Sequence, residues 1–261
     1  MTDDAKAPPR LDPRAALFLD FDGTLAAIAP RPEAVVVGDW VRPALTRLQA
    51  ALGGALALVS GRPLTELDAL LAPLRLPAAG VHGAERRDAD GRLHRLVATP
   101  PAQAVLRAER LVALYAGLQL ERKPAALALH FRARPQLGEL CAQALRSAAR
   151  RHRDWTVMTG KCVVELKPAA ASKAVAVRAF GATAAFAGRV PVFVGDDATD
   201  EDGFDAVQSA GGWGVKVGAG PSVARYRLAD PPAVRAWLQD SLAAWPGATQ
   251  GVAAATGGAA A

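Results

Sequence analysis

Two pairs of closely spaced carboxylates are the residues whose types and spacing could best do chemistry in this chain. Asp20 and Asp22 follow one short apolar run, and Asp196 and Asp197 follow another. Like charges at this spacing repel, and burial raises their pKa values unless a cation or hydrogen-bond donors compensate. Either pair alone also fits an acidic turn or a helix N-cap. The two pairs together favour a site, because each stands where a buried strand would end.

A magnesium ion is the natural compensating charge for these carboxylates. In an open α/β sheet, ligands bind outside the carboxyl ends of the strands, so neighbouring strands would bring their acidic ends together. Mg²⁺ prefers hard oxygen ligands in octahedral geometry and keeps several waters. The sequence therefore predicts a metal site formed by Asp20, Asp22, Asp196 and Asp197, with Asp200 within a helical turn of them.

Groups suited to phosphoryl oxygens occur at two other places in the chain. Ser60 follows a second apolar run and precedes Gly61 and Arg62, and Lys173 stands at the start of a helix-like segment. A hydroxyl, turn amides and an ammonium group all favour anions. Alone, a serine at a strand end is usually a cap and a helix lysine is usually solvated. Beside two acidic strand ends, they predict a phosphoryl-transfer site.

These parts fit a reaction that passes through an aspartyl-phosphate. Asp20 would be the carboxylate nucleophile, which splits phosphoryl transfer into two easier steps. Asp22 would protonate the leaving oxygen and then take a proton from the attacking water. The metal, Lys173 and Ser60 would neutralise the charge that spreads over the phosphoryl oxygens.

The segments that carry these residues alternate between strand-like and helix-like patterns. This alternation predicts a doubly wound α/β core with a parallel sheet. Strands are expected at 17–19, 55–60, 78–81, 190–194 and 213–217, and helices at 41–52, 64–71, 172–180, 199–207 and 233–245.

The middle of the chain has a different pattern and predicts a separate α+β unit. A hairpin is expected around the turn at 88–91, followed by helices at 101–118 and 137–152 and strands at 125–132, 155–158 and 162–166. We therefore expect a discontinuous core at 1–86 and 168–245, with this unit at 87–167 between its two parts. The remaining segment, 246–261, is rich in Gly, Ala and Thr without a hydrophobic period, which is typical of disorder.

Composition excludes several classes of protein. No apolar run approaches the ~20 residues that span a bilayer, and the first residues lack the apolar region of a signal peptide, so the cytoplasm is expected. Two cysteines are too few for a disulfide framework. The net charge of +6 lacks the aromatic interleaving of a nucleic-acid binder and fits a small anionic substrate at least as well. No nucleic-acid or membrane partner is expected, and a monomer is slightly favoured.

Several motifs together resemble the haloacid dehalogenase-like (HAD) phosphatases, and further motifs resemble the trehalose-6-phosphate phosphatase family within them. The likeness extends from about residue 15 to about residue 240 and departs from the family pattern at Ala174, where glycine is usual. The motifs are Asp20-Phe-Asp-Gly-Thr-Leu25, Ser60-Gly-Arg62, Gly80-Val-His-Gly-Ala-Glu85, His130-Phe-Arg132, Gly160-Lys-x-Val-Val-Glu-x-Lys-Pro168, Lys173 and Gly195-Asp-Asp-Ala-Thr-Asp-Glu-Asp-Gly-Phe204.

The resemblance implies an activity, a cofactor and a fold. It implies magnesium-dependent hydrolysis of trehalose 6-phosphate to trehalose and phosphate, a step of trehalose biosynthesis. It also implies a Rossmann-like core and an inserted C2-type cap formed by the α+β unit. Cap closure would exclude bulk water from the site. Asp20 would then bind the metal through its carboxylate, whereas Asp22 would offer its backbone carbonyl and keep its side chain free for proton transfer.

The resemblance also names residues for the sugar. Arg62, Glu85, Lys123, Arg132, Lys161 and Glu165 are the candidates for substrate binding. Lys161 and Glu165 have the same parity on a strand, so their side chains share a face. The alternative to a sugar contact is that the two form a surface ion pair. Lys123 and Arg132 fit solvated edge charges equally well, and His82 and His130 either orient neighbours or lie in the core.

Two other functions stay open at this stage. A phospho-accepting signalling module also uses a strand-end Asp, an acidic pair, a hydroxyl group and a Lys on a parallel sheet. It needs neither Asp22 nor a domain-sized insert. The other alternative is a phosphatase of the same class for another sugar phosphate, such as that of sucrose or mannosyl-glycerate.

Overall fold

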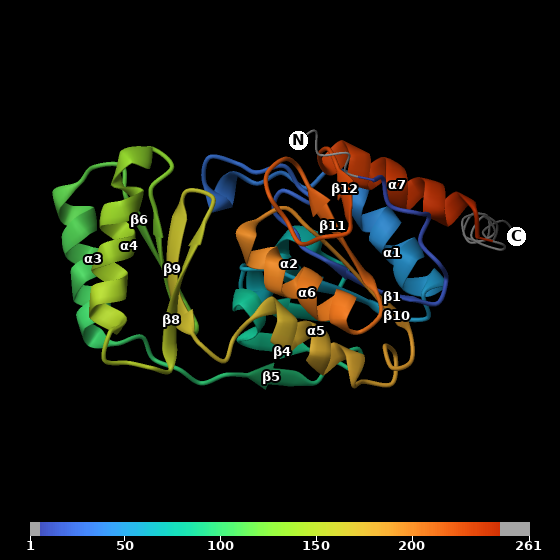
Figure 1. The fold of residues 1–261 in the computed structure, drawn as a ribbon, viewed down its shortest axis with the longest axis horizontal. Helices are drawn as coiled ribbons and strands as arrows, with labels where there is room; N and C mark the ends of the chain where they lie inside the picture. Colours follow the sequence, from blue (N-terminus) through green and yellow to red (C-terminus); the bar gives the residue numbers. More distant parts are fainter. Residues whose placement is uncertain (1–5, 246–261) are drawn as a thin grey trace, which may run out of the picture.

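The computed structural model describes residues 6–245, so the tail at 246–261 that we predicted to be disordered lies outside the described part. Two sheets lie apart from each other along the long axis of the molecule (Figure 1). Within residues 6–245, no helix combines the length and the apolar character that crossing a bilayer requires. The cytoplasmic location stays a prediction.

The larger sheet has eight strands in the order β12-β11-β10-β1-β2-β3-β4-β5. All neighbouring strands in it are parallel except β4, which is antiparallel to both β3 and β5. This mostly parallel sheet confirms the predicted α/β class. Its strands are β1 (Ala15–Leu19), β2 (Leu56–Val59), β3 (Ala78–Gly80), β4 (Glu85–Arg87), β5 (Leu93–Arg95), β10 (Val190–Gly195), β11 (Trp213–Val217) and β12 (Tyr226–Leu228).

The centre of this sheet brings the two acidic strand ends together. All five residues of β1 are buried, as expected for an apolar strand covered on both faces. β1 pairs in parallel with β10, and Leu19 stands opposite Val194. The backbone N–H of Asp20 then donates to the Val194 carbonyl at 2.9 Å. Asp20 and Asp196 therefore leave the sheet at the same edge, as the sequence predicted.

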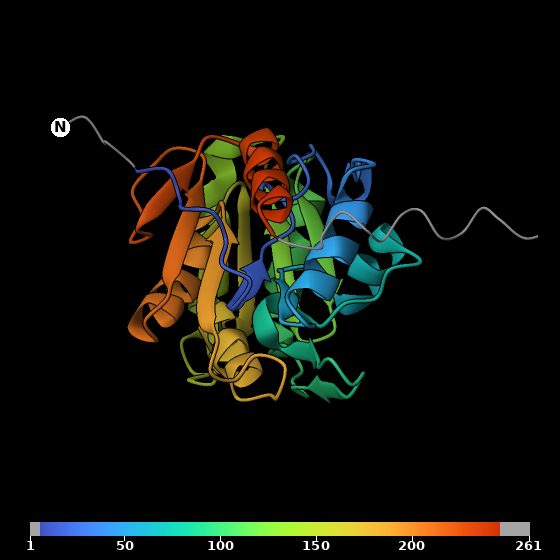
Figure 2. The same ribbon diagram turned by 90° about the vertical axis from the view of Figure 1, so that its right-hand side faces the viewer.

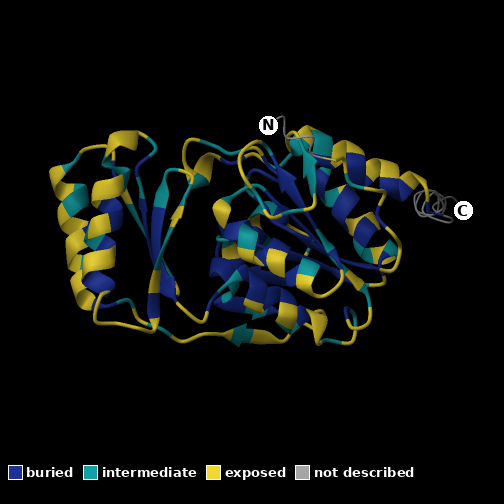
Figure 3. Cartoon of the chain, viewed as in Figure 1, coloured by how far each residue is buried: buried dark blue, intermediate teal, exposed yellow. Residues whose placement is uncertain are grey.

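Helices cover both faces of the large sheet. α1 (Val41–Ala51) and α2 (Leu64–Leu71) lie on one face, and α5 (Lys173–Gly181) and α6 (Glu201–Ser209) lie on the other (Figure 2). α7 (Pro231–Ala243) packs against α1. The central strands β1, β2, β10 and β11 between these layers are almost entirely buried, so they hold the residues at their ends in place (Figure 3).

The second sheet is antiparallel and has helices on one face only, and we call it together with these helices the cap. α3 and α4 cover the face that points away from the large sheet (Figure 1). Its order is β6-β7-β9-β8. The cap elements are α3 (Ala102–Leu114), β6 (Gln119–Lys123), β7 (Ala126–His130), α4 (Gly138–Ala149), β8 (Trp155–Gly160) and β9 (Val163–Pro168).

Side chains alternate along the cap strands, so the two faces of the cap sheet carry different residues. Leu127 and Leu129 of β7 belong to the apolar cluster under the cap helices. Ala126, of opposite parity, belongs to a small cluster with Val81 and Ala84 of the core. The inner face of the cap sheet therefore lies against the core, with small residues where the two come into contact.

Several details differ from the pattern that the sequence predicts, among them the short edge strand β12, which was not expected. β6 was not expected, because its polar sequence Gln-Leu-Glu-Arg-Lys lacks the apolar run of a buried strand. The hairpin of β4 and β5, which we placed in the middle unit, instead continues the large sheet from β3. We propose that the cap begins after β5 rather than at residue 87.

Candidate active site

A buried lysine organises the carboxylates at the end of β1. The Ser172 hydroxyl caps α5 by accepting from the Val175 N–H at 3.1 Å, which places Lys173 at the first position of the helix. The Lys173 ammonium donates to Asp20 Oδ1 at 2.9 Å and to Asp200 Oδ1 at 2.5 Å. All three side chains are buried. Lys173 thus links the strand β1 to the turn that follows β10.

Lys173 does not neutralise the carboxylates by itself. Burial and the neighbouring acidic groups raise the pKa of Asp20 well above its usual range. Burial, together with Asp200 and Asp197, raises the pKa of Asp196 to about 7. Burial opposes the charge on Lys173, but Asp20 and Asp200 outweigh it and raise the lysine pKa. The cluster therefore holds more negative charge than one ammonium group compensates.

The donor set of this cluster fits a divalent metal ion. Asp20, Asp196 and Asp200 each offer a carboxylate oxygen, and these atoms all lie within 4.8 Å of one another. Gly23 has φ +81°, and a Cβ there would lie 2.2 Å from the Asp196 carboxylate, so only glycine leaves room for it. Clustered carboxylates against a tight turn provide the oxygen ligands that hard cations prefer.

The carboxylate cluster differs from the predicted metal set at the turn after β10. Among the described residues, Asp200 contributes a carboxylate oxygen to the cluster and Asp197 does not. The backbone N–H of Asp197 instead donates to Asp200 Oδ2 at 2.9 Å. The turn after β10 therefore orients Asp200 inward, which the spacing of the acidic residues did not reveal.

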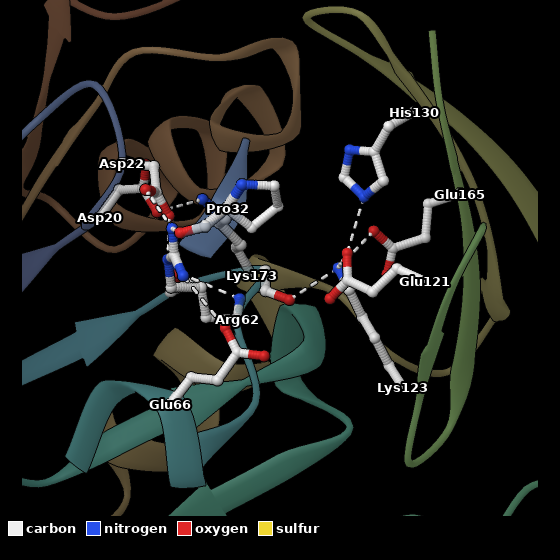
Figure 4. A network of polar contacts seen from close by, with 12 residues as sticks. Asp20, Asp22, Pro32, Arg62, Glu66, Glu121, Lys123, His130, Glu165 and Lys173 are labelled. Carbon is white, nitrogen blue, oxygen red and sulfur yellow. Dashed lines mark hydrogen bonds and ion pairs between the residues drawn. The ribbon is translucent and has the colours of Figure 1, made fainter. Parts of the chain in front are cut away.

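The carboxylate of Asp22, the predicted acid–base group, is paired with Arg62 in this structure. Arg62 holds its carboxylate with two hydrogen bonds, Nε to Oδ2 at 2.6 Å and Nη2 to Oδ1 at 2.9 Å. Arg62 also donates to Glu66 and to the Pro32 carbonyl, each at 3.0 Å. A bidentate pair of this kind is among the stronger polar contacts in proteins. Arg62 thus lies beside the proposed acid–base group (Figure 4).

Ser60 lies where the sequence placed it, at the end of β2 and buried. Its hydroxyl accepts from the Arg62 N–H at 3.2 Å, so the turn after β2 is held against Ser60. Asp20, Asp22, Ser60 and Lys173 all line one cavity of about 590 Å³. The four residues that we predicted for catalysis therefore meet in one place.

The cap supplies the opposite wall of this cavity through a second buried lysine. Lys123 of β6 donates to Glu165 Oε2 at 3.0 Å and, across the boundary with the core, to the Gly61 carbonyl at 2.9 Å (Figure 4). Burial opposes the ionised form of Glu165, but Lys123 and His82 outweigh it and hold the pKa of this carboxyl well below its usual range. The side chains of Lys123 and Glu165 are thus shielded from solvent, although β6 is an edge strand of the cap sheet.

Of the other residues that we predicted to contact the sugar, some line the cavity and one does not. Arg132 and Lys161 line the cavity, and Arg132 donates to the Lys161 carbonyl at 3.3 Å. Lys161 stands in the turn between β8 and β9, and no ion pair joins it to Glu165 among the described residues. Glu85 is not among the lining residues. Its carboxylate accepts from the Leu64 N–H at 3.0 Å and so caps α2.

Sequence reasoning did not assign several residues of the cavity. Glu121 and His130 line it from adjacent cap strands and contact each other at 2.7 Å. Gln119 also lines it, one strand period before Glu121. The alternation at 119, 121 and 123 is the signal that could have revealed these residues, but it was hidden because β6 was not expected. A further wall comes from the loop that follows β1, and its lining residues are Ile28, Ala29, Pro30, Arg31, Pro32 and Val35.

Comparisons with known proteins agree with this geometry. Residues 18–232 match a family model described as trehalose-phosphatase. The chain is 46% identical over 242 residues to the trehalose-6-phosphate phosphatase of Escherichia coli (strain K12), covering 92% of this chain and 91% of that protein.

Solved structures show the same fold. The C-terminal domain of the C. albicans trehalose-6-phosphate phosphatase superposes with a TM-score of 0.81 at 23% identity, covering 91% of this chain and 97% of that one. A phosphatase of the haloalkanoate (HAD) superfamily from Bacteroides thetaiotaomicron superposes with a TM-score of 0.56 at 18% identity, covering 86% and 94%. These likenesses confirm a HAD-like core with a separate cap.

Proposed function

Because the chain belongs to the trehalose-phosphatase family, we propose that it hydrolyses trehalose 6-phosphate to trehalose and phosphate. The observation that carries this proposal is that one cavity has Asp20 and Lys173 at one wall and polar cap residues at the other. Its volume lies within the ~300–1,000 Å³ that is usual for small-molecule sites. Because the chain belongs to a phosphatase family, we favour a phosphatase over the signalling module considered above.

The reaction would proceed in two steps at the core wall. The Asp20 carboxylate attacks phosphorus, the bond to the sugar oxygen breaks, and an aspartyl-phosphate forms. Asp22 protonates the leaving oxygen, then removes a proton from the water that attacks the aspartyl-phosphate and releases phosphate. The donors at Lys173 and Ser60 would hold the phosphoryl oxygens throughout. A magnesium ion held by Asp20, Asp196 and Asp200 would supply further charge neutralisation when bound.

The contact between Arg62 and Asp22 gives substrate binding a role in this chemistry. Both oxygens of the Asp22 carboxylate accept hydrogen bonds from Arg62, and these bonds would loosen as Asp22 turns to the leaving oxygen. A phosphate group is itself a bidentate partner for a guanidinium group. Arrival of the substrate phosphate would therefore compete for Arg62 and release the carboxylate for proton transfer.

The cap would recognise the sugar. Lys123, Arg132, Lys161 and Glu165 line the cavity on the cap side, and such groups bind hydroxyls with directed hydrogen bonds. Glu85 is better explained as a cap of α2 than as a sugar contact. Among the described residues, the sugar-facing wall thus comes almost entirely from β6, β7, β9 and the turns beside them.

The test is phosphate release from the trehalose, sucrose, mannosyl-glycerate and glucose phosphates, each with magnesium and with excess chelator. We expect turnover of trehalose 6-phosphate above all, lost in chelator and restored by added Mg²⁺. Asp20→Asn should lower turnover by at least about 10³-fold, because no covalent intermediate can form. A preference for another sugar phosphate would contradict the proposed substrate. Full activity in chelator would contradict the proposed role of the metal.

A further inference from the structure

His82 is a histidine of the core that reaches the cap, and neither the metal site nor the catalytic groups use it. It lies in the short turn at Val81–Gly83 that follows β3. Val81 has φ +48° and His82 has φ +53°, both in the left-handed region that residues with a Cβ avoid. For a β-branched valine this is a true outlier, and such strain persists where the surroundings dictate it, often at functional sites.

The strained turn places the imidazole ring of His82 between Glu165 of the cap and Gly61 of the core. His82 Nε2 lies 3.2 Å from Glu165 Oε2, and both side chains are buried. A Cβ on Gly61 would lie 2.7 Å from Nε2, so the ring occupies the room that this glycine leaves. A Cβ on Gly83 would lie 2.7 Å from the Ser172 carbonyl, so the same turn also packs closely against the start of α5.

The partner of the ring decides which nitrogen carries the proton. Burial lowers the pKa of His82, although Glu165 opposes this, so the ring is neutral at neutral pH. A neutral imidazole has one N–H donor and one acceptor nitrogen. Glu165 is ionised and only accepts, so we assign the proton to Nε2. His82 therefore donates to the cap carboxylate.

This donation leaves the two oxygens of Glu165 unequal. Oε2 accepts from both His82 and Lys123, whereas Oε1 is buried and has no hydrogen-bond partner among the described residues. A buried carboxylate oxygen without a donor is costly, and a sugar hydroxyl in the cavity would supply one. Glu165 lines the cavity, and the two hydrogen bonds to Oε2 hold the orientation of its carboxylate and with it the position of Oε1.

We propose that His82 is a positioning residue for sugar recognition: its Nε2–H holds Oε2 of Glu165, so that Oε1 is presented to a hydroxyl of the substrate. The proposal rests on the function given above, because it assumes that the cap wall binds a sugar. If His82 has this role, a residue of the core contributes to sugar recognition together with the cap.

The test compares a sugar phosphate with a phosphate ester that has no sugar. His82→Leu removes the donor with similar bulk, and His82→Gln keeps an N–H donor on a side chain of similar length. Michaelis parameters are measured for trehalose 6-phosphate and for p-nitrophenyl phosphate, with His94→Leu on β5 as a control outside the cavity. For trehalose 6-phosphate, we expect His82→Leu to raise KM about ten-fold, corresponding to about 1.4 kcal/mol.

The other measurements separate positioning from a structural role. kcat/KM for p-nitrophenyl phosphate should stay within about two-fold, and His82→Gln should restore most of the KM for the sugar phosphate. In a Glu165→Ala background, His82→Leu should have no further effect on KM, because the carboxylate it positions is gone. Parallel losses on both substrates, or the same fold-change in both backgrounds, would contradict the proposal.

The result also distinguishes this inference from the proposed function. A wild-type enzyme that does not hydrolyse trehalose 6-phosphate would refute the function whatever His82 does. An active wild type with an unchanged KM in His82→Leu would refute only the role of His82.

Discussion

Lys173 and Lys123 are both buried, and each lies between oxygen acceptors, but their surroundings differ in one respect. The partners of Lys173, Asp20 and Asp200, both belong to the core. The partners of Lys123 come from two parts of the molecule, Glu165 from the cap and the Gly61 carbonyl from the core. The first arrangement exists wherever the large sheet is folded, whereas the second exists only when the cap lies against the core.

This difference separates chemistry from recognition. The groups that would handle the phosphoryl oxygens are preorganised by buried parallel strands, which is where electrostatic catalysis gains most. The groups that would recognise the sugar are completed by contacts across the cavity. Substrates that lack a sugar should therefore depend on the first lysine alone, and sugar phosphates on both.

Replacement of Lys173 should have the largest effect. Lys173→Met removes the ammonium group from two buried carboxylates and from the transferring phosphoryl group. We expect kcat to fall by about 10²–10³-fold for trehalose 6-phosphate and p-nitrophenyl phosphate alike. Loss of one partner of a buried ion pair also costs about 3–5 kcal/mol, so the rates are measured well below the Tm of the variant. Arg178→Met, exposed on the same helix, is the matched control, and a loss confined to the sugar phosphate would contradict the assignment.

Replacement of Lys123 should affect only the sugar phosphate. Lys123→Met removes a charged hydrogen bond to Glu165 and the link to Gly61. We expect KM for trehalose 6-phosphate to rise about 10–100-fold, since hydrogen bonds to charged groups contribute about 1.5–3 kcal/mol. Turnover of p-nitrophenyl phosphate should hardly change. Arg122→Met, on the preceding exposed position of β6, is the control, and equal losses on both substrates would remove the distinction between the two lysines.

The smallest effect is on the pH dependence of stability. The pKa of Glu165 is held well below its usual value in the folded protein, so its ionised form stabilises the fold above the unfolded pKa of about 4.3. That contribution is lost as the pH falls from about 5 toward the folded pKa. The Tm of Glu165→Gln should therefore lie below that of the wild type at pH 7 and approach it on acidification to about pH 3. Glu139→Gln, at an exposed site on α4, is the control for the charge change alone, and parallel curves for Glu165→Gln and the wild type would contradict the prediction.

The sequence by itself determined the class of the fold and the position of two acidic pairs at strand ends. Apolar runs such as 17–19 and 190–194 are long enough for buried strands, and their alternation with helices leaves few topologies. The observed bounds of α2 and β11 are those that we predicted. Local sequence places each acidic pair at the end of a strand, and the pairing of β1 with β10 brings Asp20 and Asp196 to the same edge.

Only the tertiary structure decided which side chains complete the site. Asp200 rather than Asp197 turns inward, Arg62 holds Asp22 from 40 residues away, and His82 meets Glu165 across 83 residues. A side chain takes its rotamer from the neighbours that packing brings to it, and these neighbours are remote in sequence. The carboxylates that follow the chain's first strand thus have their place from local pattern, but their partners come from the register of distant elements.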